Sequence, residues 1–539
     1  MATTDVSPAA PIKDDSARLN DAPPWRLYLM MAVIVLYCEI AALQYSMVAA
    51  AVRQIAPTFP STGAGISWML IIFGIVGGVV TPILGKLSDL VGKRLVMLGT
   101  GVFFLIGSFI CALTSNWPLF LVGRGLQAVS IAAPAVAYGL IRDLFPRKYV
   151  PIAVGMIATG FGLSALAAPL LGGWMLDSYS WRSIFWFLII YTAVLTPALF
   201  FLVPETRIRA NQSLDITGAV LLGAGVGSAL LYLSQGQAWG WGRFTSYGYL
   251  ILGIVLLVAF VLVERRAREP IMDMKLLFNP KLSLTLLCGG LLAIVIGTQG
   301  YVVAYLLQSP TKAQLGAQFI DGAIKQGLPA DVASKATVVF NTPSSGFGLS
   351  LFDYATHAAI FSGGMSMLAG IGFAAATRKI GARIPAILAC VLMGLACLLY
   401  GLFNAQWYEF ALVGMVFGIG FGCYYASLPN MIVDAVPADQ QGISSGMFGV
   451  INSIGVSIGA AITAAILSGN VLTAELHVPG MPLSQTAPHG PTVLSTQLYT
   501  LHGYAVSLWV SAGACVIALA VAIYMKHGRT PTTGGEISH

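Results

Sequence analysis

Charged residues are scarce in this chain: Asp, Glu, Lys and Arg make up only 9% of its 539 residues. Ordinary soluble domains carry about 25%, so a protein built from three or four soluble domains is excluded. The seven cysteines follow neither a metal-site spacing nor a disulfide framework. The chain also lacks a Gly-x-x-x-x-Gly-Lys-Ser/Thr phosphate loop and a His-Glu-x-x-His motif. We therefore expect no enzyme activity, no metal ion and no cofactor.

Hydrophobic residues, in contrast, make up 57% of the chain and occur in long runs. The runs Ile66–Gly85, Leu95–Leu113 and Leu250–Val263 contain no charged residue. About 20 apolar residues in a helix cross a hydrocarbon core of about 30 Å. Inside lipid, a helix satisfies its own backbone hydrogen bonds. The sequence therefore predicts an all-α polytopic membrane protein.

Counting these runs gives fourteen predicted spans, arranged as six, two and six. They cover residues 27–52, 66–85, 95–113, 117–140, 150–175, 182–204, 214–234, 247–264, 282–307, 351–377, 384–404, 408–430, 441–468 and 502–525. The resulting division is a disordered tail (1–26), a six-helix half (27–204), a two-helix linker hairpin with charged flanks (205–281), a second six-helix half (282–525) and a tail (526–539). Two stretches of the second half, about 308–350 and 470–502, are predicted to be long outer loops.

The distribution of positive charge predicts the orientation of the chain. If the N-terminus is cytoplasmic, 21 of the 28 Lys and Arg residues fall in inside segments and 6 in outside segments. Such an excess of positive charge inside is typical of membrane proteins. We therefore expect both tails to be cytoplasmic, and we assign the net charge of +7 to topology. No nucleic-acid partner and no obligate protein partner is indicated.

The segment after the second span carries a specific pattern of turn and charged residues. It contains Gly85, Asp89, Gly92, Lys93 and Arg94. Glycine permits a tight turn, and the aspartate can pair with Lys or Arg. This pattern resembles the loop signature of the major facilitator superfamily. The resemblance implies a cytoplasmic gating loop that latches the inside while the outside is open.

A fainter copy of this loop follows the second span of the second half. Aligning Gly381 with Gly92 places Arg383 on Arg94. Such an echo is expected of a transporter built from two parallel halves.

Two further motifs strengthen the resemblance. Arg124–Ala128 is similar to the family pattern Arg-x-x-Gln-Gly, with alanine in place of the last glycine. The fifth span resembles the antiporter signature Gly-x-x-x-Gly-Pro-x-x-Gly-Gly, with both leading glycines replaced. The residues at its five fixed positions are Ser164, Ala168, Pro169, Gly172 and Gly173, of which the first two are the replacements. Small residues at this spacing let two helices approach closely.

Together, the span count, the linker hairpin and the motifs resemble the fourteen-span multidrug exporters driven by proton antiport. The resemblance implies a major facilitator fold with fourteen transmembrane helices, in a bacterial plasma membrane. It also implies export of small, amphipathic and often cationic compounds by alternating access. Two alternatives stay open: a transporter for one lipid, siderophore, metabolite or aromatic acid, and a membrane receptor that transports nothing.

Ionisable residues deep in a span are functional candidates, because burying a charge in lipid costs at least ~2.5–3.5 kcal/mol. Glu39 lies near the middle of the first span, and Arg124 lies in the fourth. Gln44 and Gln127 are expected at matching depths, and the resemblance places these two spans around a central cavity. We therefore predict one site for protons and substrate formed by these four residues. A fixed Glu39–Arg124 ion pair is the structural alternative.

The choice of Glu39 as the proton carrier rests on a departure from the family pattern. The resembling exporters commonly place an aspartate in the first span, and Gln44 occupies that position here. Proton coupling would then fall to Glu39, because an apolar site favours the neutral form of a carboxyl group. Asp353 and His357 are weaker candidates, four residues apart and expected on one helix face.

Overall fold

The computed structural model describes most of the chain. The described residues are 18–146, 149–206, 215–267, 270, 272, 274–325, 337–340, 346–403, 406–436, 441–477, 492–493 and 498–528. The predicted disordered tail therefore lies largely outside the described residues, and so does most of the tail after 525.

The described residues are mostly helical. The helices are α1 (Pro24–Ile55), α2 (Trp68–Val91), α3 (Lys93–Leu113), α4 (Trp117–Ala128), α5 (Ala133–Leu144), α6 (Val150–Ser178), α7 (Arg182–Leu202), α8 (Ile216–Trp239), α9 (Phe244–Glu264), α10 (Met274–Leu277), α11 (Pro280–Gln308), α12 (Lys312–Lys325), α14 (Leu351–Tyr354), α15 (Ile360–Ile380), α16 (Arg383–Leu402), α17 (Trp407–Asp434), α18 (Gln441–Ser468) and α20 (Leu501–Tyr524). Each of the fourteen predicted spans coincides with one of these helices or with a helix interrupted by a short turn.

Within the described part of the chain, twelve helices are long and apolar enough to cross a membrane. A thirteenth span is added if α2 is counted with its 41° bend between Thr81 and Ile83. α6, with 29 residues, is the helix that coincides with the fifth predicted span. The fourth span is interrupted by a 3₁₀ turn between α4 and α5, and the tenth by a π-helical turn at Ala355–Ala359. The fold is therefore the predicted all-α polytopic membrane fold, with twelve to thirteen spans among the described residues meeting these criteria where fourteen were predicted.

Several boundaries follow directly from local chemistry. Gly92 has φ of 124°, a conformation that glycine adopts without steric cost, and it separates α2 from α3. The side chain of Asn116 accepts a hydrogen bond from the Leu119 amide and caps α4. Asp215 caps α8 in the same way through the Gly218 amide. These caps satisfy backbone donors that the first turn of a helix leaves unpaired.

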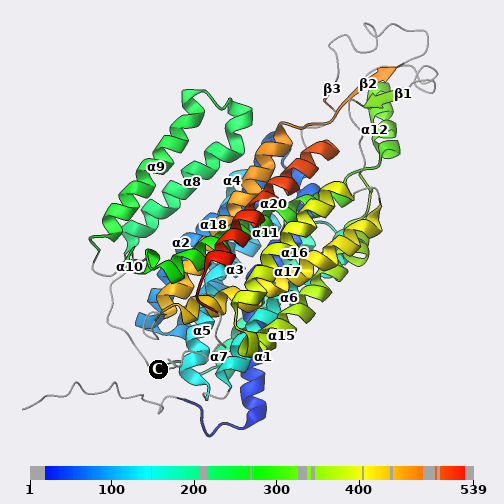
Figure 1. Ribbon diagram of the computed structural model, residues 1–539. Helices are drawn as coiled ribbons and strands as arrows, with labels where there is room; N and C mark the ends of the chain where they lie inside the picture. Colours follow the sequence, from blue (N-terminus) through cyan, green and yellow to red (C-terminus); the bar gives the residue numbers. More distant parts are fainter. Residues whose placement is uncertain are drawn as a thin grey trace, which may run out of the picture.

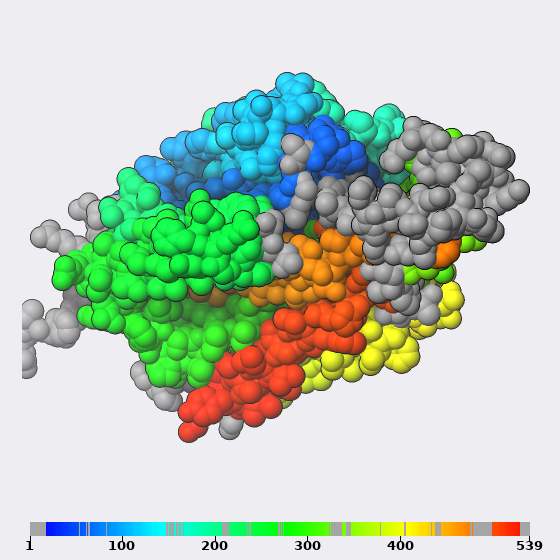
Figure 2. All heavy atoms as spheres, turned by 90° about the horizontal axis from the view of Figure 1, so that it is seen from above, coloured from blue at the N-terminus to red at the C-terminus, as the bar shows by residue number. Residues whose placement is uncertain are grey.

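The helices form two blocks that lie side by side (Figure 2). We call α1–α7 the first block and α11 with α14–α20 the last block. Between the blocks, α2 packs on α18, α1 on α11, and α6 on α14 and α15. We call the bundle end where α1 begins and α20 ends the terminus side, and the opposite end the loop side.

The α8–α9 hairpin lies at the edge of the bundle (Figure 1). α8 packs on both α2 of the first block and α18 of the last block. The contact with α2 is close, since a Cβ atom on Gly223 would lie 2.7 Å from Val79. α9 contacts α8 and exposes much of its apolar surface. The hairpin thus covers the seam between the two blocks on one side.

Parts of the two long loops pair with each other on the loop side. β1 (Thr337–Phe340) runs antiparallel to β2 (Thr473–His477), and β2 pairs with β3 (Thr492–Val493). Figure 1 shows this small sheet and α12 projecting beyond the ends of the long helices. The sequence predicted only loops here, and the pairing joins strands that lie more than 130 residues apart.

Candidate functional site

Arg124 is the centre of a buried polar cluster at the junction of four helices of the first block. Its Nε donates to the Met69 carbonyl of α2 at 2.9 Å, and its Nη1 donates to Gln127 Oε1 at 2.8 Å. The same oxygen accepts from Gln44 of α1 at 3.2 Å, and the Gln127 amide donates to Ser108 of α3 at 2.8 Å. We call these five residues the Arg124 cluster.

The guanidinium in this cluster is held without a carboxylate. Arg124 is fully buried, and its side chain lies over the Phe73 ring at 5.0 Å. Such a cation–π contact replaces part of the lost hydration. In the described residues Arg124 forms no ion pair, and its Nη2 and the Oε1 of Gln44 have no hydrogen-bond partner. The cluster ties α1, α2, α3 and α4 together within one block.

Glu39 lies in a separate pocket between α1 and α6. Its side chain is 1% exposed, and its Oε2 accepts a hydrogen bond from the Ser164 hydroxyl of α6. The other oxygen, Oε1, has no hydrogen-bond partner in the described structure. It lies against Gly160, where a Cβ atom would collide with the carboxylate. We call Glu39, Ser164 and Gly160 the Glu39 pocket.

The four residues expected around one site therefore occupy two places. Gln44, Arg124 and Gln127 come together, whereas Glu39 turns to α6 and binds Ser164. No Glu39–Arg124 ion pair forms between these two described residues, so the structural alternative of a fixed ion pair is wrong. The reason is the helix period: positions 39 and 44 are five residues apart, which places them on different faces of α1.

Tyrosines from both blocks lie near the Glu39 pocket. Tyr138 of α5 and Tyr425 of α17 are close enough to Glu39 to interact with it electrostatically. Asn452 of α18 contacts the hydroxyl of Tyr425, and it accepts a hydrogen bond from Tyr424 at 2.8 Å. Tyrosines of both blocks are thus within electrostatic range of the pocket. The sequence predicted no tyrosine here, because a tyrosine in a span carries no signal of which face it occupies.

The antiporter-like motif of α6 lines α1 and the last block. Ala168 is fully buried, and Gly172 packs on Met47 of α1. Pro169 lies inside the helix, directly after Ala168 and three residues before Gly172. A Cβ atom on Gly173 would lie 2.6 Å from the Phe352 backbone of α14. The small residues thus permit close packing, as the sequence predicted.

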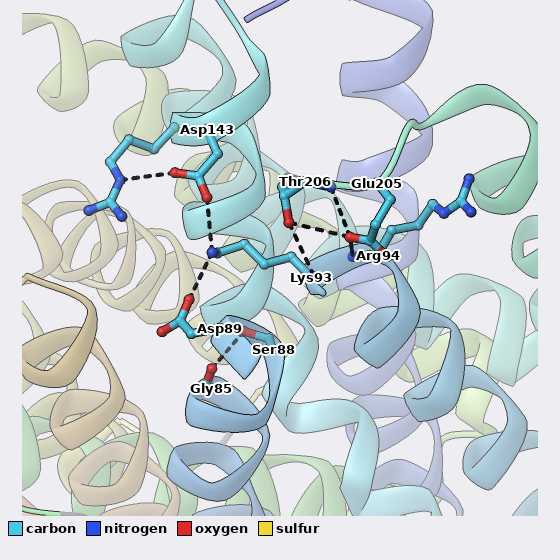
Figure 3. A network of polar contacts seen from close by, with 9 residues as sticks. Gly85, Ser88, Asp89, Lys93, Arg94, Asp143, Glu205 and Thr206 are labelled. Carbon is cyan, nitrogen blue, oxygen red and sulfur yellow. Dashed lines mark hydrogen bonds and ion pairs between the residues drawn. The ribbon is translucent and has the colours of Figure 1, made fainter. Parts of the chain in front are cut away.

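The loop between α2 and α3 is a charged cluster on the terminus side. Lys93 Nζ lies 2.8 Å from Asp89 Oδ1 and 2.9 Å from Asp143 Oδ2 of α5 (Figure 3). The side chains of Lys93 and Asp143 are only 5% and 6% exposed. Ser88 donates to the Gly85 carbonyl and closes the last turn of α2. Asp89 therefore pairs with a lysine, as the sequence allowed; the partner Asp143 was not predicted.

Arg94 fastens the same loop to the end of α7. Glu205 accepts hydrogen bonds from the Arg94 and Leu95 amides at 3.0 and 2.9 Å, where a carboxylate complements the N-terminus of α3 (Figure 3). The Arg94 guanidinium donates to the carbonyls of Phe200 and Val203.

The corresponding loop of the last block also turns at a glycine with positive φ. Gly381 separates α15 from α16 with φ of 77°. Arg383 donates to the carbonyls of Ala522 and Ile523, at the end of α20. α7 and α20 are the last long helices of their blocks, so each arginine holds the equivalent helix end.

Asp353 and His357 do not form the expected side-chain pair. The imidazole Nδ1 lies 2.8 Å from the main-chain carbonyl of Asp353, and the ring packs edge-on against Trp407 at 4.7 Å. The π-helical turn at Ala355–Ala359 changes the local helix period and disturbs the i to i+4 register. Within the described chain we find no group of three or more His, Cys, Asp or Glu residues suited to a metal ion.

A Gly-x-Ser-x-Gly pattern also occurs, around Ser444 and around Ser457. In hydrolases this pattern needs a sharp turn from a strand into a helix. Both serines instead lie inside the continuous helix α18, and Ser457 donates to the Ser453 carbonyl at 3.0 Å. The pattern therefore reflects small residues at a helix interface.

Comparison with known proteins identifies the family. The sequence profile of the Major Facilitator Superfamily matches residues 34–324 and 327–472. The chain belongs to the major facilitator superfamily. It is a multi-span membrane transporter of that family, as the sequence motifs predicted.

Three relatives illustrate the range of similarity. An uncharacterised MFS-type transporter of Bacillus subtilis, YvkA, is 28% identical over 78% of this chain and 86% of its own length. The multidrug transporter protein MdtP of the same species is 30% identical over 42% of each chain. The tetracenomycin C resistance and export protein of Streptomyces glaucescens is 25% identical over 83% of this chain and 77% of its own.

Solved structures agree on the fold. The human organic anion transporter MFSD10 has a TM-score of 0.58 at 15% identity, covering 93% of this chain and 100% of that chain. A bacterial homologue of the human lysosomal transporter Spinster has a TM-score of 0.58 at 14% identity, with 96% and 99% covered.

Proposed function

We propose that this transporter exports small amphipathic compounds, cations among them, in exchange for protons. The observation that carries the proposal is Glu39, a carboxyl buried in the middle of a span with one unpaired oxygen and tyrosines of both blocks nearby. An ionisable group is costly in lipid and marks an ion or substrate pathway by default. The relatives named for multidrug transport and for tetracenomycin C export support export as the direction of transport.

The proposed mechanism uses the junction between the two blocks. Substrate binds there while Glu39 is deprotonated, and protonation of Glu39 from the outside releases it. The blocks then rock, and Glu39 returns its proton to the cytoplasm. The ion pairs of Lys93 with Asp89 and Asp143 hold the terminus side closed in one of the two states, with that side facing the cytoplasm. The Arg124 cluster keeps the first block rigid during the exchange.

Inverted membrane vesicles test this proposal. We expect a proton gradient to drive accumulation of ethidium and of several unrelated cationic dyes, and each dye to dissipate part of the gradient. Glu39→Gln should reduce the accumulation to background. Asp177→Asn, which removes an exposed carboxyl at the end of α6, is the matched control and should transport normally. Dye accumulation that survives in a well-folded Glu39→Gln protein would contradict the proposal.

A narrow natural substrate is the second candidate, because one relative is named for the export of a single compound, tetracenomycin C. The same vesicles separate the two candidates. Movement of many unrelated dyes supports multidrug export, and movement of none in folded wild-type protein contradicts it. A search with lipids, siderophores and aromatic acids would then follow.

A further inference from the structure

We propose that Ser164 is a positioning residue that holds the Glu39 carboxylate between α1 and α6. The inference deepens the proposed function and rests on Glu39 as the coupling acid. Ser164 occupies a position where the antiporter signature has glycine, and its hydroxyl donates to Glu39 Oε2. Both side chains are almost fully buried, at 2% and 1% exposed. The motif that elsewhere only allows close packing thus supplies a hydrogen-bond donor in this chain.

The pocket is shaped by a row of small residues along α6. Gly160, Ser164, Ala168 and Gly172 follow one another every four residues and share one helix face. Gly160 lies against Val35 and Glu39, and Gly172 lies against Met47. The contacts run in the same order along both helices, so this face follows α1 over about three turns. This close packing of α1 and α6 brings the Ser164 hydroxyl within hydrogen-bond distance of the Glu39 carboxylate.

Gly160 provides the space for the carboxylate. A Cβ atom at this position would collide with Oε1 of Glu39, the oxygen that has no hydrogen-bond partner. An alanine there would push the carboxylate out of the pocket, toward the junction between the blocks. Gly160 and Ser164 therefore act together: Gly160 leaves space for the carboxylate, and Ser164 donates the hydrogen bond to it.

The hydroxyl should affect the charge state of the acid. A hydrogen bond donated to a carboxylate favours its ionised form, so loss of the hydroxyl should let Glu39 keep its proton to higher pH. The other titratable groups that interact with Glu39 are Cys38 on the same helix, Tyr138 of α5, Tyr191 of α7 and Tyr425 of α17. A thiol and three phenols are neutral near pH 7. Ser164 is thus the group best placed to adjust Glu39 in that range.

Infrared pH titration of the purified full-length protein tests this role without requiring transport. The carboxylic C=O band that disappears in Glu39→Gln reports the protonation of Glu39. We expect its pH midpoint to rise by about one unit in Ser164→Gly and in Ser164→Ala, which is a tenfold change in proton affinity. Ser164→Thr keeps a hydroxyl and should stay within a few tenths of a unit of wild type. Leu163→Ala, on the lipid-exposed side of α6, is the matched control.

Ethidium-driven proton release from the same proteins gives the functional readout. Ser164→Gly should retain release with the midpoint moved in the same direction, and Gly160→Ala should reduce transport about tenfold or more. An unchanged infrared midpoint in folded Ser164→Gly and Ser164→Ala overturns the positioning role. If Glu39→Gln still couples dye to protons, the proposed function fails instead, and the infrared titration still decides whether Ser164 positions Glu39.

Discussion

The Arg124 cluster and the Glu39 pocket lie in the same block, yet they differ in what surrounds the buried charge. In the cluster, hydrogen bonds connect Arg124, Gln127, Gln44 and Ser108 with the Met69 carbonyl, across four helices of the first block. In the pocket, one hydroxyl of one neighbouring helix binds Glu39, and tyrosines of both blocks lie nearby.

We interpret this difference as separating a structural charge, Arg124, from the coupling charge that we propose, Glu39. A network inside one block keeps its partners when the blocks move relative to each other. A group at the junction changes its surroundings with each movement, and its proton affinity changes with them. Burial alone therefore does not identify the coupling residue, since both charges are buried.

The largest effect on stability is expected at Lys93, in a third buried cluster that resembles the Arg124 cluster in its connections. Lys93→Met removes the cation that Asp89 and Asp143 share, and leaves the buried Asp143 with only the half-exposed Arg142, at 3.5 Å. Loss of one partner of a buried ion pair costs about 3–5 kcal/mol, so we expect a clearly lower unfolding midpoint in detergent. Lys93→Arg keeps the positive charge and should restore most of the lost stability. An unchanged midpoint in Lys93→Met would show that the cluster is not structural.

A smaller loss is expected when the Arg124 cluster loses its shared acceptor. Gln127→Leu removes the oxygen that binds Arg124 and Gln44, and each buried polar group left unpaired costs about 1–3 kcal/mol. The unfolding midpoint should fall, while the pH midpoint of proton release should stay at its wild-type value. The control is Val122→Ala, on the lipid-exposed face of α4. A shift of that pH midpoint would remove the distinction between the two sites.

The smallest effect is expected at His527, which is only partly buried and lies after α20. Its Nε2 lies 2.8 Å from Thr285 Oγ1. Burial, with Lys281 and Arg383 nearby, lowers the pKa of His527 from 6.5 to about 4. Above pH 6.5 the imidazole is neutral whether the chain is folded or not. The stabilising contribution of neutral His527 to the free energy of unfolding is then fully present. As the pH falls toward 4 the unfolded chain binds the proton first, so that contribution is lost.

This sign gives a direct test by thermal unfolding. Between about pH 7.5 and about pH 5, the unfolding midpoint of wild type should fall by slightly more than that of His527→Gln. The size of this difference between the two proteins tests whether the partly exposed His527 contact contributes less to stability than the two buried clusters do. Equal pH dependence in both proteins would contradict the contact.

The sequence predicted the helices and the charged turn between α2 and α3, but only part of the site. Long apolar runs set the spans directly, and the spacing from Gly85 to Arg94 places Asp89 one helical turn from Lys93. The bond between Glu39 and Ser164 joins residues 125 positions apart. Neither that pairing nor the pairing of β1 with β2 follows from local periodicity, because each depends on how distant segments pack. The tyrosines near Glu39 escaped prediction for the same reason.

Reconstituted proteoliposomes test the central claim, that Glu39 couples protons to transport, most directly. Gradient-driven uptake of ethidium is compared with ethidium exchange at equal pH on both sides, for wild type and Glu39→Gln. We expect the variant to lose gradient-driven accumulation and to keep exchange, because alternating access does not itself require the proton. Accumulation driven by the gradient in Glu39→Gln would contradict the account and place the coupling group elsewhere.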